Sequence, residues 1–370
     1  MSQLPVISLF AGAGGLDLAV HRCAEAPLVQ DGADGPLKTV VATDWDKAAL
    51  ASFERNFPGV PTLQGDIRQM KSSGIMKAAG LRKGDAYLVV GGPPCTPFSK
   101  SGFWLEEKRT STDPDASLLD EYVRVVRDTQ PAGFVLENVQ GLTYRTHASQ
   151  FARLLGQFSE LGYNPQWKVL LAADYGVPQL RRRVFVVGRR DGVPFEFPTP
   201  THGGLSERHD SSDETLRPYV TARTAFKGLR TKAEPGEIAD GAYGELLASV
   251  PPGHNYLWHT DRGGGLPVFG WRKRYWTFLL RLEPGRPSTT VQAQPGPWVG
   301  PFHWQNVRNG QGELRARRLR VSELLRLMTF PPTFYAGEDR STVQRQIGNA
   351  VPLELGKVVI RSLLEQMGEL

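Results

Sequence analysis

The sequence predicts an α/β fold: a doubly wound, mostly parallel Rossmann-like sheet with a second, smaller domain inserted into it. From residue 6 to about residue 190, short apolar runs alternate with helical segments, which is the pattern of βα units in a parallel sheet. From Phe197 a polar stretch rich in turn formers follows, and the alternation stops. The next hundred or so residues hold five of the chain's 8 tryptophans, so we expect a folded domain there rather than a tail.

The individual elements follow in order along the chain. Short apolar runs bounded by turn formers predict buried strands, and apolar residues three and four apart predict helices. The predicted strands are residues 6–9, 38–43, a short third strand before Gln64, and residues 86–90, 132–137, 168–172 and 184–189. The predicted helices are residues 16–26, 47–56, 117–128 and 151–161, followed after the second domain by residues 318–328 and 353–367.

Composition narrows the class of protein and its surroundings. No apolar stretch approaches the ~20 residues that span a bilayer, and the N-terminus lacks the charged and apolar regions of a signal peptide. Two cysteines, Cys23 and Cys95, cannot build a disulfide framework or a cysteine-based zinc site. We therefore expect a cytoplasmic protein without a structural metal. The net charge of +6 favours a polyanionic partner.

A glycine-rich turn follows the first strand and opens the first helix. Glycines there let the backbone approach a ligand and point its N–H groups at it. The spacing differs from a dinucleotide fingerprint because Asp17 stands where the third glycine would be. The residues expected to face the ligand are Phe10, Ala11, Gly12, Gly14 and Gly15.

Acidic residues end the next two strands. Asp44 suits a ribose diol, Trp45 could stack on an adenine face, and Asp66 suits an exocyclic amine. Each aspartate taken alone is equally explained as a helix cap. The glycine-rich turn, Asp44 and Asp66 lie at the carboxyl ends of three successive strands. A bound ligand therefore explains the three together better than separate helix caps do. They describe an adenosine-containing cofactor without a clear pyrophosphate site.

Two further strand ends carry reactive groups. Cys95 follows a Gly-Gly-Pro-Pro turn directly behind the apolar run 86–90, so its thiol is held on a stiff loop. Glu137 closes the next predicted strand and could face the same pocket. A lone glutamate is usually a cap, and a free cysteine is usually a small buried hydrophobe. We expect the second description to hold for Cys23, not for Cys95.

A basic run precedes the strand at residues 184–189. Strand alternation puts Gln179, Arg181 and Arg183 on one side and Arg182 on the other. An arginine near a thiol lowers its pKa and offers fixed donors to a polar ring. A surface basic cluster is the other explanation, and it suits Arg182 best.

These motifs, in this order, resemble the cytosine-C5 DNA methyltransferases of restriction-modification systems over nearly the whole chain. The shared segments are Phe10 to Gly15, Asp44-Trp45, Gly92-Pro-Pro-Cys95 with Phe98-Ser99, Glu137-Asn138-Val139, Gln179-x-Arg-x-Arg183, Arg317-x-Leu319 with Glu323 and Arg326-Leu327, and Gln346 to Pro352. The chain departs from the common pattern at Thr96, Arg320 and Met328-Thr329. These departures concern loop and hinge geometry more than the reaction.

The resemblance implies a reaction and a cofactor. S-adenosyl-L-methionine would donate a methyl group to C5 of a flipped-out cytosine in a specific double-stranded DNA sequence, through a covalent bond from Cys95 to C6. Glu137 would hold the base by N3 and N4, Arg183 would bind O2, and Arg181 would buttress the site. The cofactor set would also include Ile67, Pro93 and Asn349.

The resemblance also implies a domain organisation and partners. Residues 1–196 and 340–370 would form the catalytic domain, 197–316 the target-recognition domain and 317–339 a hinge. The loop from Thr96 to about residue 115 would close over the flipped base. A monomer is expected, with a cognate restriction endonuclease encoded separately. The expected DNA contacts are Ser99, Lys100, Arg272, Arg274 and Gln294. For Lys100, a solvated surface charge is an equally good explanation. The aromatic residues between Trp271 and Trp276 could instead belong to the core of the small domain.

Three alternatives remain at this point. A tRNA-cytosine methyltransferase of the same family would have a small recognition domain, which the long tryptophan-rich insert disfavours. A non-catalytic DNA-binding relative would lack the cysteine or the glutamate, and both are present. A small-molecule methyltransferase or NAD enzyme leaves the second domain unexplained.

Overall fold

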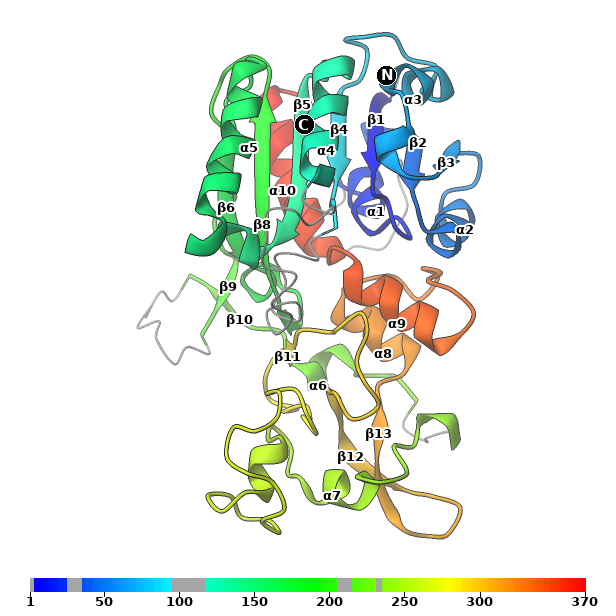
Figure 1. Cartoon of the computed structure of the whole chain (residues 1–370), viewed down its shortest axis with the longest axis vertical. Coiled ribbons are helices and arrows are strands. Elements are labelled where there is room, and N and C mark those ends of the chain that lie inside the picture. The colour runs from blue at the N-terminus through cyan, green and yellow to red at the C-terminus, as the bar shows by residue number, and fades with distance from the viewer. Residues whose placement is uncertain (1–2, 25–34, 95–116, 205–214, 231–234) are drawn as a thin grey trace.

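The computed structural model describes residues 3–24, 35–94, 117–204, 215–230 and 235–370. They form a sheet lobe and a smaller lobe below it, with α8 and α9 lying between the two (Figure 1). The carboxyl ends of the parallel strands point toward the small lobe (Figure 1). None of the helices in these ranges is long and apolar enough to cross a membrane.

The sheet confirms the predicted doubly wound class. Its strands lie in the order β3-β2-β1-β4-β5-β8-β6. All neighbours from β3 to β5 run parallel, while β8 runs antiparallel to both β5 and β6. In chain order the strands are β1 (Leu4–Leu9), β2 (Leu37–Asp44), β3 (Thr62–Gln64), β4 (Leu88–Gly91), β5 (Gly133–Val139), β6 (Gln166–Leu171) and β8 (Arg182–Arg189).

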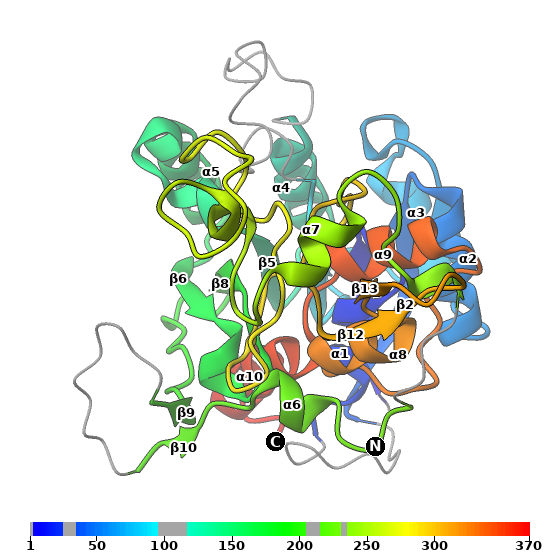
Figure 2. The same cartoon turned by 90° about the horizontal axis from the view of Figure 1, so that it is seen from below.

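Helices cover both faces of this sheet, with α1 and α10 on one side and α4 and α5 on the other (Figure 2). The α-helices of the sheet lobe are α1 (Gly15–His21), α2 (Lys47–Asn56), α3 (Ser72–Ala79), α4 (Ser117–Thr129), α5 (Ala148–Glu160) and α10 (Leu353–Met367). Its 3-10 turns are η1 (Ile67–Gln69), η5 (Gln140–Thr143), η6 (Arg145–His147) and η7 (Ala172–Tyr175).

Strand alternation divides the core between the two faces. In β5, Phe134 and Leu136 join the cluster under α4 and α5, whereas Val135 joins the cluster under α1 and α10. In β1, Ile7 and Val6 divide in the same way. Because consecutive side chains of a strand point to opposite faces, a continuous apolar run fills both cores.

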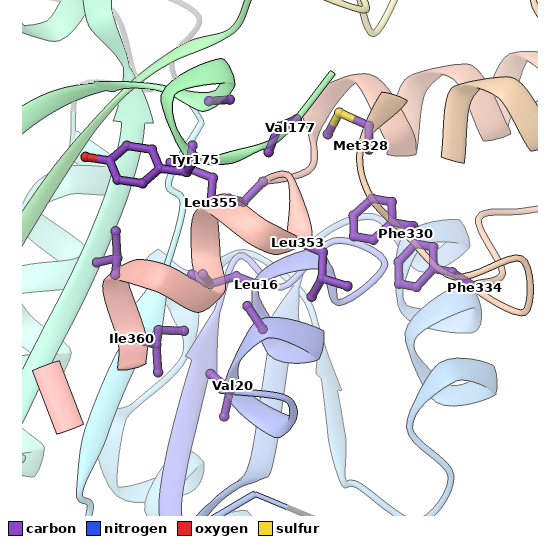
Figure 3. Packing of buried hydrophobic residues seen from close by; sticks show 14 of the residues in the cluster. Leu16, Val20, Tyr175, Val177, Met328, Phe330, Phe334, Leu353, Leu355 and Ile360 are labelled. Carbon is purple, nitrogen blue, oxygen red and sulfur yellow. The ribbon is translucent and has the colours of Figure 1, made fainter. Parts of the chain in front are cut away.

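The C-terminal helix returns to the sheet lobe and covers α1. Figure 3 shows Leu16 and Val20 of α1 near Leu353 and Ile360 of α10, with Phe330 at the edge of the same cluster. Gly356 makes this approach possible, since a Cβ there would lie 2.8 Å from Ala19. The sheet lobe therefore contains residues from both ends of the described chain.

The small lobe has its own core and little regular structure. Its hairpin joins β12 (Phe302–Arg308) to β13 (Leu314–Arg318), which are antiparallel. Buried Tyr256, Leu279 and Phe302 centre the core, and Trp258 and Trp298 pack against it. Its remaining elements, with those at the junction, are β7 (Gln179–Leu180), β9 (His202–Gly203), β10 (Arg217–Pro218), β11 (Ser288–Thr289), α6 (Ala222–Ala225), η8 (Pro235–Glu237), α7 (Gly244–Ser249), η9 (Tyr256–His259), α8 (Val321–Leu327) and α9 (Arg340–Asn349).

Two predicted helix boundaries were wrong. The helix expected over residues 16–26 ends at His21, where the Arg22 N–H still bonds to Leu18 but the backbone leaves the helical region. The helix expected over residues 318–328 begins at Val321, because Arg318 closes the β13 strand. Cys23 is fully buried, as expected, and burial raises the pKa of its thiol to about 11.

A buried carboxyl ties α1 to the first two strands. Asp17 accepts hydrogen bonds from the Ser8 hydroxyl of β1 at 3.0 Å and the Thr39 hydroxyl of β2 at 2.9 Å. Burial raises its pKa from 3.8 to about 6, although both hydroxyls act to lower it. Loss of hydration therefore outweighs the two hydrogen bonds.

This shift predicts how folding stability depends on pH. Asp17 ionises near pH 3.8 in the unfolded chain but only near pH 6 in the folded chain. The free energy of unfolding therefore falls as the pH rises between these two values, and it levels off above them. The full loss is on the order of 3 kcal/mol. We expect Asp17→Asn to be more stable relative to the wild type at pH 7.5 than at pH 5, measured by urea unfolding. A constant difference at both pH values would contradict this account.

Candidate active site

The turn after β1 is shaped by left-handed backbone at Phe10, Gly12 and Gly14, with φ of 53°, 58° and 88°. Gly14 must be glycine, because a Cβ there would lie 2.2 Å from the Phe57 ring. At Gly12 a Cβ would meet nothing within 4 Å. The turn thus packs against α2 at one end and presents open backbone at the other.

Asp44 fastens this turn to the end of β2. Its Oδ2 accepts the Gly12 N–H at 2.8 Å and its Oδ1 accepts the Asp46 N–H at 2.9 Å. Burial raises the pKa of Asp44. Beside it the Trp45 side chain is 71% exposed. A large ring left in water next to a buried carboxylate and an open glycine turn fits an adenosine group, which offers a ring to stack and hydroxyls to bond.

Asp66 lies beside Asp44 but is already engaged. The Gly65 N–H donates to the Asp44 carbonyl at 3.0 Å, which brings the two strand ends together. Asp66 caps η1 through the Arg68 N–H and forms an ion pair with the Arg68 guanidinium at 2.7 Å, which lowers its pKa. Ile67 is buried behind it. Asp66 therefore acts as a cap in this structure, which was the alternative interpretation.

Glu137 and Arg183 form a buried pair at the end of β5. Antiparallel pairing of β5 with β8 sets Val139 opposite Arg183, and Arg183 Nε lies 2.7 Å from Glu137 Oε1. The N–H does not point along this line, so that oxygen lacks an aligned donor. Burial raises the pKa of Glu137, while the charges of Arg183 and Arg181 act to lower it. The carboxyl thus keeps hydrogen-bonding capacity for another polar group.

The turn leading to Cys95 is held directly against this pair. Strands β4 and β5 are parallel neighbours, and a Cβ on Gly92 would lie 2.8 Å from Glu137 Oε2. Asn138 donates to the Pro93 carbonyl at 3.1 Å. Cys95 itself lies outside the described residues, as do Thr96, Ser99 and Lys100. The sequence pattern did not reveal the roles of Gly92 and Asn138, although both belong to the recognised motifs.

The run before β8 follows the predicted alternation. Gln179 and Arg181 are fully buried, Arg183 is half-buried and Arg182 is exposed. Arg181 donates to the carbonyls of Val291, Gly348 and Ala350 at 3.2, 2.7 and 3.0 Å. Arg181 therefore joins the sheet lobe to the segment after β11 and to the end of α9.

The C-terminal motif packs beside the glycine-rich turn. A Cβ on Gly15 would lie 3.1 Å from the Ala350 Cβ and 3.3 Å from the Val351 carbonyl. Gly348 presses on the Ala293 backbone, where a Cβ would come within 2.4 Å. Asn349 is exposed at the end of α9. Asn56 strengthens the junction by donating to the Ala13 and Tyr335 carbonyls, and no motif pointed to it.

The predicted DNA contacts in the small lobe are on its surface. Arg272, Arg274 and Gln294 are all exposed. His303, in contrast, is buried, stacks against both Phe226 and Trp304, and has its pKa lowered to about 3 by burial. It stays neutral and belongs to the core.

Arg320 and Met328-Thr329, the departures from the common pattern that the structure describes, serve packing. Arg320 forms an ion pair with Glu237 at 2.8 Å, and its N–H donates to Glu323 at the start of α8. Thr329 has a φ of 57° and accepts the Glu354 N–H at 3.0 Å, which caps α10. The Met328 carbonyl accepts the Leu353 N–H at 3.0 Å. Met328 and Thr329 therefore fix where the C-terminal helix starts.

The family model for C-5 cytosine-specific DNA methylases matches residues 4–365. The chain is 62% identical to the Type II methyltransferase M.SacI of Streptomyces achromogenes over 368 residues, covering 100% of this chain and 94% of that protein.

Solved structures agree on the fold. A putative DNA modification methyltransferase encoded within an Escherichia coli prophage matches with a TM-score of 0.67 at 20% identity, over 99% of this chain and 100% of that one. The Dnmt2 methyltransferase of Schizosaccharomyces pombe matches with a TM-score of 0.65 at 18% identity, over 99% of both chains. The match over residues 4–365, together with the 62% identity, shows that the chain belongs to the C-5 cytosine-specific DNA methylase family and is a DNA (cytosine-5-)-methyltransferase.

Proposed function

We propose that this enzyme transfers a methyl group from S-adenosyl-L-methionine to C5 of a flipped-out cytosine in one double-stranded DNA sequence, through a covalent bond between Cys95 and C6. The observation that carries the proposal is the buried Glu137–Arg183 pair, which lies against the Gly92–Pro93 turn that leads to Cys95. The likeness to M.SacI supports a role as the modification enzyme of a type II restriction-modification system.

Cys95 makes the unreactive C5 carbon nucleophilic. Its thiolate adds to C6, and the electrons of the C5–C6 double bond move to C5, which is covalent catalysis. After C5 has gained a methyl group, a base, which could be water, removes the C5 proton and the thiolate leaves. Only the thiolate reacts, so the charges of Arg181 and Arg183 near this strand end favour the step.

Glu137 is the residue that we assign to holding the cytosine base. The Watson–Crick edge of cytosine offers an acceptor at N3 and a donor at N4, and a protonated carboxyl complements both. Burial, which raises the pKa of Glu137, favours this protonated form. Arg183, already in contact with Glu137, is the donor we assign to O2. Arg181 acts by holding the surrounding backbone.

The cofactor supplies an electrophilic methyl group. Asp44 would bind its ribose, Trp45 its adenine face, and the backbone of Phe10, Ala11, Gly12, Gly14 and Gly15 its remaining part. Ile67, Pro93 and Asn349 border the same region, and Asp66 would reach the adenine amine only by exchanging its contact with Arg68.

The division of labour between the lobes is also part of the proposal. Residues 1–196 and 340–370 form the catalytic domain, 197–316 the target-recognition domain and 317–339 the hinge. Arg272, Arg274 and Gln294 would contact DNA from the small lobe, and Ser99 and Lys100 from the loop after Cys95. The enzyme would act as a monomer in the cytoplasm, beside a separately encoded restriction endonuclease.

The decisive experiment incubates the purified protein with labelled S-adenosylmethionine and either plasmid DNA or total tRNA. Methylcytosine is then mapped by sequencing. We expect label in DNA, at one recurring sequence and on cytosine. Label confined to tRNA would support the alternative substrate, and label on adenine would refute the proposal.

The covalent step predicts a trapped complex. An oligonucleotide duplex with 5-fluorocytosine at the mapped position has no C5 proton to lose, so the Cys95–C6 bond should persist on a denaturing gel. We expect the complex to vanish in Cys95→Ala and to remain in Cys23→Ala, which changes the other cysteine. A covalent complex in Cys95→Ala would remove Cys95 from its role.

The role of Glu137 predicts a pH dependence. Because the protonated carboxyl is the active form, the wild-type rate should fall as pH rises through its elevated pKa. In Glu137→Gln we expect the rate to drop by about 10²-fold or more and this alkaline fall to disappear. Single-turnover rates with saturating DNA, measured across pH, check both points. An unchanged alkaline fall in the variant would assign it to another group.

A further inference from the structure

Asn56, the last residue of α2, joins two segments that lie far apart in the sequence. Its Nδ2 donates to the Ala13 carbonyl at 3.0 Å and to the Tyr335 carbonyl at 2.8 Å, and its Oδ1 accepts the Tyr335 N–H at 2.8 Å. The reversed amide would set its oxygen against two carbonyls, so these contacts allow only one orientation. One side chain thus bonds to the glycine-rich turn and to the segment between α8 and α9.

The Ala13 carbonyl belongs to the turn that we assign to the cofactor. Gly12, the residue before it, has a φ of 58° and would have nothing within 4 Å of a Cβ. Because no side chain restricts a glycine, the direction of its peptide groups depends on bonds from outside the turn. Asp44 holds the peptide group before Gly12, and Asn56 holds the peptide group after Ala13.

The segment that contains Tyr335 is packed against the same turn. The Arg55 guanidinium carbon lies 4.1 Å from the centre of the Tyr335 ring. The buried rings of Phe330 and Phe334 stack with their centres 4.3 Å apart. A Cβ on Gly15 would lie 3.2 Å from the Phe330 ring. Residues 330–335 therefore contact the glycine-rich turn by packing and are bonded to it through Asn56.

The other end of α2 is bonded to α9, which lies below α2 (Figure 1). The Arg345 guanidinium lies 3.1 Å from Oδ2 of Asp46, the residue that caps α2. Gln346 donates to the Ala48 carbonyl at 3.1 Å. Trp45, which we assign to the adenine face, directly precedes the cap. The segment from residue 335 to residue 346 thus holds α2 at both of the ends that border the cofactor region.

We propose that Asn56 is a positioning residue for the cofactor. It fixes the Ala13 carbonyl, so that the glycine-rich turn is ordered before S-adenosyl-L-methionine binds, and it couples this turn to the segment around Tyr335. This inference rests on the proposed function and deepens it. A turn that is already ordered loses less conformational freedom on binding. Because one amide bonds to both segments, a ligand that orders the turn also orders the segment after α8.

The first test measures the binding of S-adenosylhomocysteine, the cofactor without its methyl group, to the full-length protein by calorimetry. Asn56→Ala removes the amide and leaves the Ala13 carbonyl without this donor. The turn must then be ordered at the moment of binding, and we expect the dissociation constant to rise by about 10-fold. An unchanged dissociation constant would overturn the proposal.

Two variants serve as controls for this test. Arg55→Gln removes the cation above the Tyr335 ring and leaves the Asn56 amide in place. Asn164→Ala removes another half-buried asparagine, which donates to the Gly192 carbonyl at 3.0 Å at the opposite edge of the sheet, before β6. Both should bind S-adenosylhomocysteine as the wild type does. Equal weakening in Asn164→Ala would mean a general loss of stability, and Asn56 would then have no positioning role.

A second variant guards against misfolding of Asn56→Ala. Asn56→Asp keeps the size and shape of the side chain. Near about pH 8 the new carboxylate has no proton to donate to the Ala13 and Tyr335 carbonyls, whereas near about pH 5.5 a carboxyl facing two carbonyls regains one. Binding of S-adenosylhomocysteine, relative to the wild type at the same pH, should therefore be weakened more at the higher pH. Equal weakening at both would show that the donated hydrogen bond does not matter.

Hydrogen exchange tests the coupling without any measurement of activity. Exchange of the backbone amides over residues 333–338 is followed with and without saturating S-adenosylhomocysteine. In the wild type we expect the ligand to slow this exchange, because the turn and this segment are ordered together. The slowing should persist in Arg55→Gln and be lost in Asn56→Ala. Equal slowing in all three proteins would refute the coupling.

The wild type separates the failure of this inference from the failure of the proposed function. If the wild type binds no S-adenosylhomocysteine, the proposed cofactor is wrong, and the inference falls with it. If the wild type binds it and methylates DNA, and Asn56→Ala binds it equally well, the proposed function stands and only the role of Asn56 is wrong.

Discussion

One buried guanidinium, that of Arg181, holds together the parts of the chain from which the site is built. It donates to carbonyls that are 110, 167 and 169 residues away in sequence, after β11 and at the end of α9. A buried charge is costly unless it is hydrogen-bonded, and here main-chain oxygens from two segments accept bonds from both terminal nitrogens of the guanidinium. Removing it would leave three carbonyls without their donor and loosen both the lobe junction and the C-terminal motif.

The site depends on this junction because its groups come from separate strands. Gly92 directly follows β4, Glu137 lies in β5 and Arg183 lies in β8, so their proximity is set by strand order. Antiparallel β8 is what brings an arginine to the end of β5, since it enters the sheet at the edge where the parallel strands leave it. The reversed direction of β8 is thus what places Arg183 beside Glu137.

Much of this could be predicted from the sequence, and the limits have physical reasons. Apolar runs that end in Asp44, Glu137 or the Gly92 turn predict buried strands with polar ends, because each run is short and bounded by turn formers. The partners of Arg181 and of Asn56 could not be predicted, since pairing across more than a hundred residues leaves no local pattern. The start of α8 was predicted too early because Leu319 continues the apolar spacing of the helix, whereas β13 extends to Arg318.

The order of the small lobe bears on the free energy of DNA binding. In the proposed reaction a cytosine leaves the duplex, which costs about a few kcal/mol, and contacts elsewhere on the DNA would offset this cost. A flexible surface would lose conformational entropy when it became ordered on the DNA, and this cost would consume part of the binding free energy. The buried side chains of Tyr256 and Asn255 donate to the carbonyls of Arg274 and Trp276, so this part of the small lobe is ordered when the enzyme folds and avoids that loss. If the reaction begins with this distortion of its substrate, as proposed, the enzyme needs an ordered small lobe as well as the thiol of Cys95.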